Sequence, residues 1–247
     1  MLLRGQHAVV TGGGTGLGAA VAEELAGAGA KVVVLGRRQD VVARQAAKIG
    51  GLGLSCDIAD AAQTERAFRQ GQEAFGPVRV LVGCAAITRA YPLVDKDGKP
   101  ATLVSFTEMI AINLSGAYNA IRLAAASMIA SDPVDADGSR GVIINVSSCN
   151  ADYCAIPGAA GYVASKGALN AMTTQLAIEL APHGIRVVTV SAGPFATQNL
   201  FDTLPPESLE WLKQNFLFPK RLGDPLEFAQ MVRFVCENNF VNRTILR

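Results

Sequence analysis

The sequence predicts a single α/β domain in which helices cover both faces of a parallel, doubly wound sheet, giving three layers. Apolar runs rich in Val, Ile and Leu alternate with helix-like segments along most of the 247 residues, which is the order that parallel sheets require. Hydrophobic residues make up 50% of the chain and charged residues 17%, a composition suited to strands buried on both faces. A glycine-rich turn closes the first apolar run and makes the expected sheet Rossmann-like.

The first strand, turn and helix are expected within residues 8–28, and the rest of the chain is organised around them. Gly12 permits a tight exit from the strand, Gly16 lets the backbone approach a pyrophosphate, and Gly18 lets the helix pack closely on the strand. The helix N-terminus offers free N–H groups and a partial positive charge to an anion. An ordinary glycine-rich turn is the alternative, but the context favours a dinucleotide site at Gly12, Thr15, Gly16, Leu17 and Gly18.

Two strand–helix pairs follow before the fourth strand. Strands are expected at 31–35, 52–56 and 78–82, where apolar residues predominate. Helices are expected from Asp40 to about Ile49 and from Asp60 to Phe75, with each aspartate as the N-cap and glycines just beyond the C-terminal ends.

The second half of the chain departs from this rhythm at two places. Residues 91–104 are expected to form a small excursion, because Asp97-Gly98 is a hairpin signal. Residues 194–220 are rich in aromatic side chains, and we expect a mobile lid over an apolar, elongated substrate, with a core-packing or subunit-packing segment as the alternative. The remaining elements are helices at about 106–130, 162–180 and 225–236 and strands at 141–146, 185–191 and 244–246.

Composition and charge argue against several function classes. The net charge of +1 disfavours a general nucleic-acid or membrane-surface role, and no apolar run reaches the ~18 residues of a membrane span. The N-terminus enters the first strand directly, so no signal peptide is expected. The five cysteines, Cys154 among them, contain no C-x-x-C pair, and His7 and His183 lie apart from candidate ligands. We therefore expect no disulfide framework, no metal site, no Ser-His-Asp triad and a cytoplasmic location.

The strongest chemical signal is the pair Tyr162 and Lys166. Four residues apart, they share one face of a helix, and a neighbouring ammonium favours the phenolate form of a tyrosine. The pair is thus a candidate acid–base device, although two such residues at this spacing are also common for structural reasons. Ser148 follows a strand and could donate a hydrogen bond to a substrate oxygen. Asn113, in the middle of an apolar helix, suggests a particular task, with a solvent-facing side chain as the alternative.

Ligands in an open parallel sheet bind beyond the carboxyl ends of the strands. Several further residues follow predicted strands and are expected to meet in one crevice that holds a dinucleotide. These are Arg37, Asp57, Ile58, Cys84, Ala85, Gly193 and Phe195.

These motifs together resemble those of the short-chain dehydrogenase/reductase family over nearly the whole chain. They are Thr11-Gly12-x-x-x-Gly16-x-Gly18, Asp57, Asn113, Ser148 and Tyr162-x-x-x-Lys166. Within that family the chain is most similar to the type-2 3-hydroxyacyl-CoA dehydrogenases, also called type-10 17β-hydroxysteroid dehydrogenases, in the stretches 113–116, 140–145, 181–187 and 218–225.

The resemblance implies a reversible hydride transfer between a secondary alcohol and a nicotinamide cofactor. Tyr162 would be the general acid/base, and Lys166 would lower its pKa and hold the nicotinamide ribose. Ser148 would orient the substrate oxygen, and Asn113 would support a water relay to Lys166. Asp57 would contact the adenine and Thr197 the carboxamide. The family typically forms homotetramers, so we expect an oligomer; the alternative function is a dinucleotide-binding scaffold with little catalysis.

Three departures from the family pattern bear on the site. The loop after the fourth strand reads Gly83-Cys84-Ala85-Ala86 and lacks the usual Asn side chain, which predicts a looser cofactor loop. The interval from Ser148 to Tyr162 is one residue longer than usual, so Cys149 is the alternative to Ser148. Arg37 and Arg38 stand where enzymes that use NAD carry an acid, which favours NADP, with NAD as the alternative because the most similar subfamily resembles NAD users.

Overall fold

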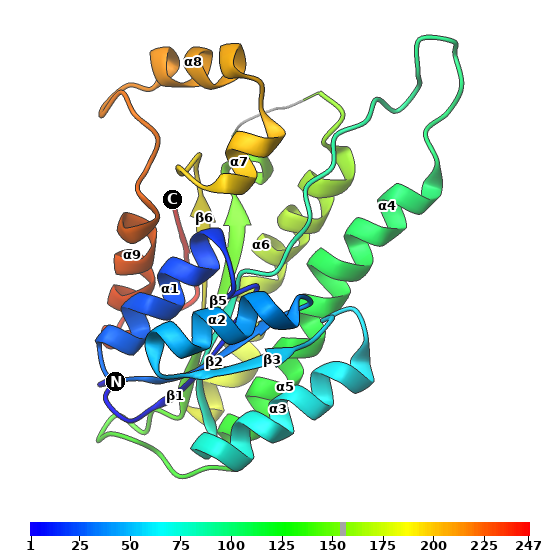
Figure 1. Ribbon diagram of the computed structural model, residues 1–247. Coiled ribbons are helices and arrows are strands. Elements are labelled where there is room, and N and C mark those ends of the chain that lie inside the picture. The colour runs from blue at the N-terminus through cyan, green and yellow to red at the C-terminus, as the bar shows by residue number, and fades with distance from the viewer. Residues whose placement is uncertain (154–156) are drawn as a thin grey trace.

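A computed structural model describes residues 1–153 and 157–247 and contains one seven-stranded sheet in the order β3-β2-β1-β4-β5-β6-β7 (Figure 1). Every neighbouring pair of strands is parallel. The predicted doubly wound sheet is therefore confirmed, and the strand order reverses between β1 and β4. The strands are β1 (His7–Thr11), β2 (Lys31–Gly36), β3 (Leu52–Ser55), β4 (Val78–Gly83), β5 (Gly141–Ser148), β6 (Ile185–Ala192) and β7 (Ile245–Leu246).

Helices cover both faces of the sheet, as Figure 1 shows. One face carries α1 (Gly16–Gly27), α2 (Gln39–Ile49) and α9 (Pro225–Glu237), and the other carries α3 (Ala61–Phe75), α5 (Ala117–Ile129) and α6 (Ala160–Leu180). Two short helices, α7 (Gln198–Thr203) and α8 (Pro206–Asn215), lie beyond the carboxyl ends of β5 and β6. Among the described residues, no helix is both long and apolar enough to cross a bilayer.

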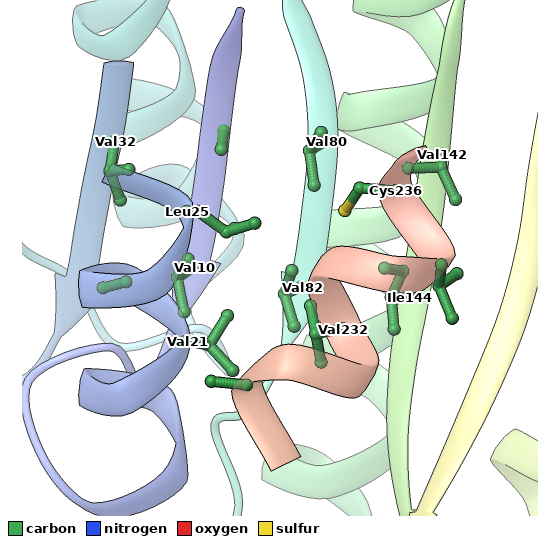
Figure 2. Close-up of a cluster of buried hydrophobic side chains, with 14 of the residues drawn as sticks. Val10, Val21, Leu25, Val32, Val80, Val82, Val142, Ile144, Val232 and Cys236 are labelled. Atoms are coloured by element: carbon green, nitrogen blue, oxygen red, sulfur yellow. The ribbon is translucent and has the colours of Figure 1, made fainter. Parts of the chain in front are cut away.

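Alternate residues of the strands supply two separate cores, because successive side chains of a strand point to opposite faces. On one face, Val10, Val82 and Ile144 pack under Leu25 of α1 and Val232 of α9 (Figure 2). On the other face, the core under α3, α5 and α6 includes Val9, Leu81, Ile143, Phe68, Ala124 and Met128. Each of the Val, Leu, Ile, Phe and Met side chains among them contributes about 1.5–3 kcal/mol when fully buried.

One of the two predicted aspartate caps is wrong. Asp60 caps α3, because its carboxylate accepts a hydrogen bond of 3.0 Å from the Gln63 amide. Asp40 lies inside the first turn of α2, and Arg38 is the N-cap residue. An acid in the first turn still favours the helix through its dipole, so the sequence signal was real but displaced by two positions.

The long apolar helix begins earlier than expected and is not uniform. It starts with α4 (Leu103–Ile110), passes through a π-helical turn (Ala111–Gly116) and continues as α5. A Cβ on Gly116 would lie 2.8 Å from the Ile58 side chain, so the helix approaches the loop after β3 closely there. The π-helical turn places Asn113 in the interior, and such turns are frequent at functional sites.

The predicted excursion is confirmed as a hairpin-like arm beyond α4 (Figure 1). Val94 and Pro100 form an antiparallel bridge, and the Asp95 carboxylate accepts hydrogen bonds of 2.9 Å from the amides of Asp97 and Lys99. Leu93, at the arm, is 79% exposed.

Candidate active site

The glycine-rich turn between β1 and α1 is shaped by close backbone approaches. Gly12 has a positive φ of 66°, and a Cβ on it would lie 2.8 Å from the Ala85 backbone. A Cβ on Gly18 would overlap the Gly12 carbonyl oxygen. Gly16 also has a positive φ, and a Cβ there would contact the Thr197 methyl group at 3.6 Å. The turn therefore lies between the loop after β4 and the segment after β6, as the sequence predicts.

The N-terminus of α1 fits an anion. Its N-cap, Thr15, makes no side-chain capping bond to any part of the chain that the structure describes, and its first turn has no acidic side chain. The first N–H groups of the helix therefore keep their donor capacity and the partial positive charge of the helix end. A pyrophosphate would satisfy both, and the glycine cradle leaves the backbone unshielded there.

Thr11 braces the loop after β4. Its carbonyl oxygen accepts a hydrogen bond of 3.1 Å from the Cys84 amide, and its hydroxyl accepts one of 3.2 Å from the Ala85 amide. These two bonds hold the loop to β1, so the looseness predicted for Gly83–Ala86 is countered at this point. Burial raises the pKa of the Cys84 thiol to about 12, which keeps it neutral.

Ser148, Tyr162 and Lys166 are brought together where β5 ends and α6 begins. The Ser148 side chain and Thr88, from the loop after β4, hydrogen-bond the Tyr162 phenol, and both contacts favour its phenolate form. The Lys166 Nζ lies 5.9 Å from the centre of the Tyr162 ring and donates a 2.7 Å hydrogen bond to the Val146 carbonyl oxygen. One turn of α6 thus presents a phenol and an ammonium beside a strand-end hydroxyl.

The pKa of Tyr162 differs from the sequence expectation. Burial raises the pKa of the phenol above its ordinary value, although the hydrogen bonds from Ser148 and Thr88 oppose this and favour the phenolate. Burial also lowers the pKa of Lys166 to about 8. The ammonium does not bring the phenol pKa below its usual range here, because desolvation of the phenolate outweighs the favourable contacts.

Ser148 and its neighbour Cys149 both lie near Tyr162. Ser148 supplies the hydrogen bond to the phenol and accepts one of 3.3 Å from the Asn150 amide. The Cys149 thiol is buried, and negative charge on it raises the pKa of the phenol. Of the two side chains, only the Ser148 hydroxyl favours the phenolate; Ser148 as the substrate-orienting residue stays a prediction.

Asn113 is 1% exposed, so the alternative of a solvent-facing side chain is wrong. Its amide clamps the Ile87 main chain: Oδ1 accepts a 2.8 Å bond from the Ile87 amide, and Nδ2 donates a 2.9 Å bond to the Ile87 carbonyl. Nδ2 also donates to the Ser165 hydroxyl at 3.2 Å, and that hydroxyl donates to the Tyr162 carbonyl at 2.7 Å. Asn113 therefore joins the loop after β4 to the turn of α6 that carries Tyr162; its relay to Lys166 stays a prediction.

The predicted adenosine-side residues lie at the carboxyl ends of β2 and β3. Arg37 is exposed directly after β2, and its carbonyl accepts a 3.1 Å hydrogen bond from the Ser55 hydroxyl. The Asp57 carboxylate accepts a 3.0 Å bond from the Ala59 amide. Ile58 is buried against Gly116 and belongs to the core. Of these three predicted residues, Ile58 packs its side chain in the core, and Arg37 and Asp57 present polar groups.

The predicted site residues after β6 also differ in whether they remain available to a ligand or pack in the core. A Cβ on Gly193 would meet nothing within 4 Å in the described chain, so its backbone is open. Thr197 lies against Gly16 and caps α7 through its hydroxyl. The Phe195 ring packs edge-on against Phe228 at 5.6 Å and forms part of the core under α9. The Phe195 ring is therefore used for packing, which its place after a strand did not reveal.

Sequence reasoning missed Thr88 and the Val146 carbonyl. Thr88 contacts the phenol from a loop with no periodic pattern, and a main-chain acceptor leaves no sequence signal. Cys154 lies outside the described residues.

Comparison with known proteins extends the similarity over the whole fold. A family model described as short chain dehydrogenase matches residues 6–206. The 3-hydroxyacyl-CoA dehydrogenase type-2 of Rattus norvegicus is 40% identical over 248 residues, covering 99% of this chain and 94% of the relative. An NADP-dependent (R)-specific alcohol dehydrogenase of Lentilactobacillus kefiri is 32% identical, covering 92% and 87%. The crystal structure of a 3-hydroxyacyl-CoA dehydrogenase type-2 from Mycobacterium avium has a TM-score of 0.92 at 31% identity, covering 98% of this chain and 94% of that one.

Proposed function

We propose that Ser148, Tyr162 and Lys166 carry the proton transfer of this chain, which belongs to the short-chain dehydrogenase family and is therefore a nicotinamide-dependent oxidoreductase. The observation that supports this most directly is the convergence of Ser148 and Lys166 on Tyr162: Ser148 hydrogen-bonds the phenol, and the Lys166 Nζ lies 5.9 Å from the centre of the ring. All three residues lie at the carboxyl edge of the sheet, the edge that also carries the glycine-rich turn. The substrate would be a secondary alcohol or its ketone.

The chain's own residues would move the proton. A bound nicotinamide dinucleotide would supply the hydride acceptor in oxidation and the donor in reduction. During oxidation, the Tyr162 phenolate would take the proton from the alcohol oxygen, while the carbon that bears this oxygen loses the hydride; during reduction, the phenol would return the proton to the oxygen. The Ser148 hydroxyl donates to the substrate oxygen and holds it beside the phenol. Lys166 places its positive charge next to the phenolate that forms. Gly12, Gly16 and the first amides of α1 would hold the pyrophosphate.

The cofactor proposed is NADP. Arg37 and Arg38 follow β2, where enzymes that bind NAD place a carboxylate on the ribose 2′-hydroxyl. No acid stands at this strand end to repel a 2′-phosphate, and a guanidinium binds phosphate bidentately. One similar protein is named as NADP-dependent, which agrees with this choice.

The substrate proposed is apolar and elongated, such as a 3-hydroxyacyl-CoA or a hydroxysteroid. The lid, residues 194–220, carries large apolar side chains that are exposed in this structure: Phe201, Trp211, Leu217 and Phe218. Exposed apolar side chains beyond the strand ends suit a surface that closes on an apolar ligand. The relatives named 3-hydroxyacyl-CoA dehydrogenase type-2 favour the thioester among these substrates.

The test is a turnover assay that follows the absorbance of the reduced nicotinamide. Acetoacetyl-CoA, a keto-steroid and a small polar sugar are each offered with NADPH and with NADH. We expect turnover of one of the first two, and expect Tyr162→Phe to abolish it while cofactor binding is nearly unchanged. Turnover of the sugar alone would reject the lid. Cofactor binding without any turnover would favour a dinucleotide-binding scaffold.

Homotetramer formation and a cytoplasmic location are part of the same proposal. Exposed apolar side chains on α5 and α6, Tyr118, Ile129 and Ile178, suit helix contacts between copies. Light scattering on the eluting protein tests the tetramer, and a fluorescent fusion expressed in cells tests the location.

A further inference from the structure

We infer that Asp152 is a positioning residue, whose carboxylate fixes the turn after β5 relative to the catalytic face of α6. This inference rests on the proposed function, because it takes Ser148 and Tyr162 as the groups to be held in register. Asp152 belongs to no predicted motif, and neither the glycine-rich turn nor the Tyr–Lys pair accounts for it.

The Asp152 carboxylate is held from three separate parts of the chain although its side chain is only 6% exposed. Oδ1 accepts a 3.0 Å hydrogen bond from the Asn170 amide nitrogen of α6 and a 3.3 Å contact from the Arg247 guanidinium. Oδ2 accepts a hydrogen bond from the Ser191 hydroxyl near the end of β6. Charge-assisted bonds of this kind fix a geometry more firmly than neutral ones.

Two of the three partners, Ser191 and Asn170, belong to elements that carry the candidate site. Ser191 lies directly opposite Ser147 in the β5–β6 pairing, next to Ser148. Asn170 follows Lys166 by four residues and therefore lies one turn further along the same helix. The carboxylate thus connects the end of β5, the end of β6 and the helix that carries Tyr162.

The main chain transmits this anchor to Ser148. Ser148 begins a short 3₁₀ turn, Cys149–Ala151, and its hydroxyl accepts from the Asn150 amide. The Asp152 amide closes that turn with a 3.1 Å bond to the Cys149 carbonyl. Because the turn is closed at one end by Ser148 and at the other by Asp152, a shift of the carboxylate moves the hydroxyl that contacts the phenol.

The orientation of Asn170 indicates that this arrangement is specific. Its amide nitrogen faces the carboxylate, while its Oδ1 is buried with no hydrogen-bond partner among the described residues. A buried carboxylate and an unpaired amide oxygen both cost free energy that apolar residues of similar size would not. The cluster is therefore better explained by the register it imposes on the turn than by stability.

The experiment compares Asp152→Asn with wild type, using the ketone that gives turnover in the assay above. Asparagine keeps the shape but removes the charge and one acceptor. We expect kcat to fall by ~10–100-fold, with KM and the cofactor Kd changed by less than ~3-fold, because the alignment of Ser148 matters in the transition state alone. Ser191→Ala should lower kcat less, and the double variant should be no slower than Asp152→Asn, since both act on one contact.

The matched control is Asp135→Asn. Asp135 also accepts hydrogen bonds on both carboxylate oxygens, from the Asn239 side chain and the Ser139 main-chain amide, but it lies outside the carboxyl edge of the sheet. The Asp135→Asn variant should have a lower Tm than wild type and an unchanged kcat. If Asp152→Asn changes kcat no more than this control, the inference is overturned; if Asp152→Asn does not fold, Ser191→Ala and Asn170→Ala decide by the same criterion. If Tyr162→Phe keeps its turnover, the proposed function fails, and this inference fails with it. If Tyr162→Phe loses turnover while Asp152→Asn keeps the wild-type kcat, the positioning role alone is refuted.

Discussion

The Lys166 Nζ donates a 2.7 Å hydrogen bond to the main-chain carbonyl of Val146, inside the protein where the lysine is 3% exposed. Burial lowers the pKa of this ammonium to about 8, from an ordinary value of 10.5. Lys166 is therefore charged at neutral pH but loses its proton under mildly alkaline conditions. The charge that would support a Tyr162 phenolate is present only below that pKa.

This depressed pKa predicts an alkaline gain in stability that Lys166→Met lacks. Between about pH 8 and 10.5 the unfolded chain holds a proton on Lys166 that the folded chain has lost, so the free energy of unfolding rises with pH in that window. The total gain is on the order of 3 kcal/mol. Urea unfolding of wild type and variant at several pH values gives the difference between them. A difference that stays constant across the window would show that Lys166 is not desolvated as described.

Substitution of Ser148 and Cys149 distinguishes the two candidates for the substrate-orienting position. Ser148→Ala removes the hydroxyl that hydrogen-bonds the Tyr162 phenol, and we expect kcat to fall by ~10²–10³-fold, as for loss of an oxyanion donor. Cys149→Ala removes a buried thiol that does not favour the phenolate, and kcat should remain close to wild type. Steady-state kinetics on both variants, with cofactor Kd measured by fluorescence, provides the check. The reverse order of effects would assign the role to Cys149.

The fold was predictable because the strands and the two cores follow from hydrophobic pattern and glycine placement. Local details failed where tertiary contacts override propensity. Asp40 and Asp60 stand in similar positions in the sequence, yet of these two only Asp60 caps its helix. The π-helical turn that buries Asn113 has the same apolar pattern as an α-helix. The phenol pKa of Tyr162 depends on burial, and Asp152 depends on partners far apart in the chain, so neither could be read from spacing.

Removal of Arg37 tests the cofactor preference. Arg37 is exposed directly after β2, so Arg37→Ala should leave stability unchanged while raising the Kd for NADPH by ~10-fold, because a charge-assisted phosphate contact is lost. The Kd for NADH should not change. Arg44→Ala, on the exposed side of α2, is the matched control for loss of positive charge. Wild-type protein that binds NADH as tightly as NADPH would contradict the preference for NADP.

Two glycines of α1 should respond to alanine in opposite directions. A Cβ on Gly18 would overlap the Gly12 carbonyl oxygen, so Gly18→Ala must push the helix away from the turn. We expect a loss of about 1–3 kcal/mol in unfolding free energy and a rise in cofactor Kd of at least ~10-fold, because the helix N-terminus no longer meets the cradle. Gly27 lies at the other end of the same helix, and a Cβ there would meet nothing within 4 Å among the described residues. Gly27→Ala should therefore stabilise the protein by about 0.4–1 kcal/mol through the unfolded chain and leave Kd unchanged. Thermal unfolding and cofactor titration on the two variants measure both effects, and unchanged cofactor binding in a folded Gly18→Ala would remove the turn from the cofactor site.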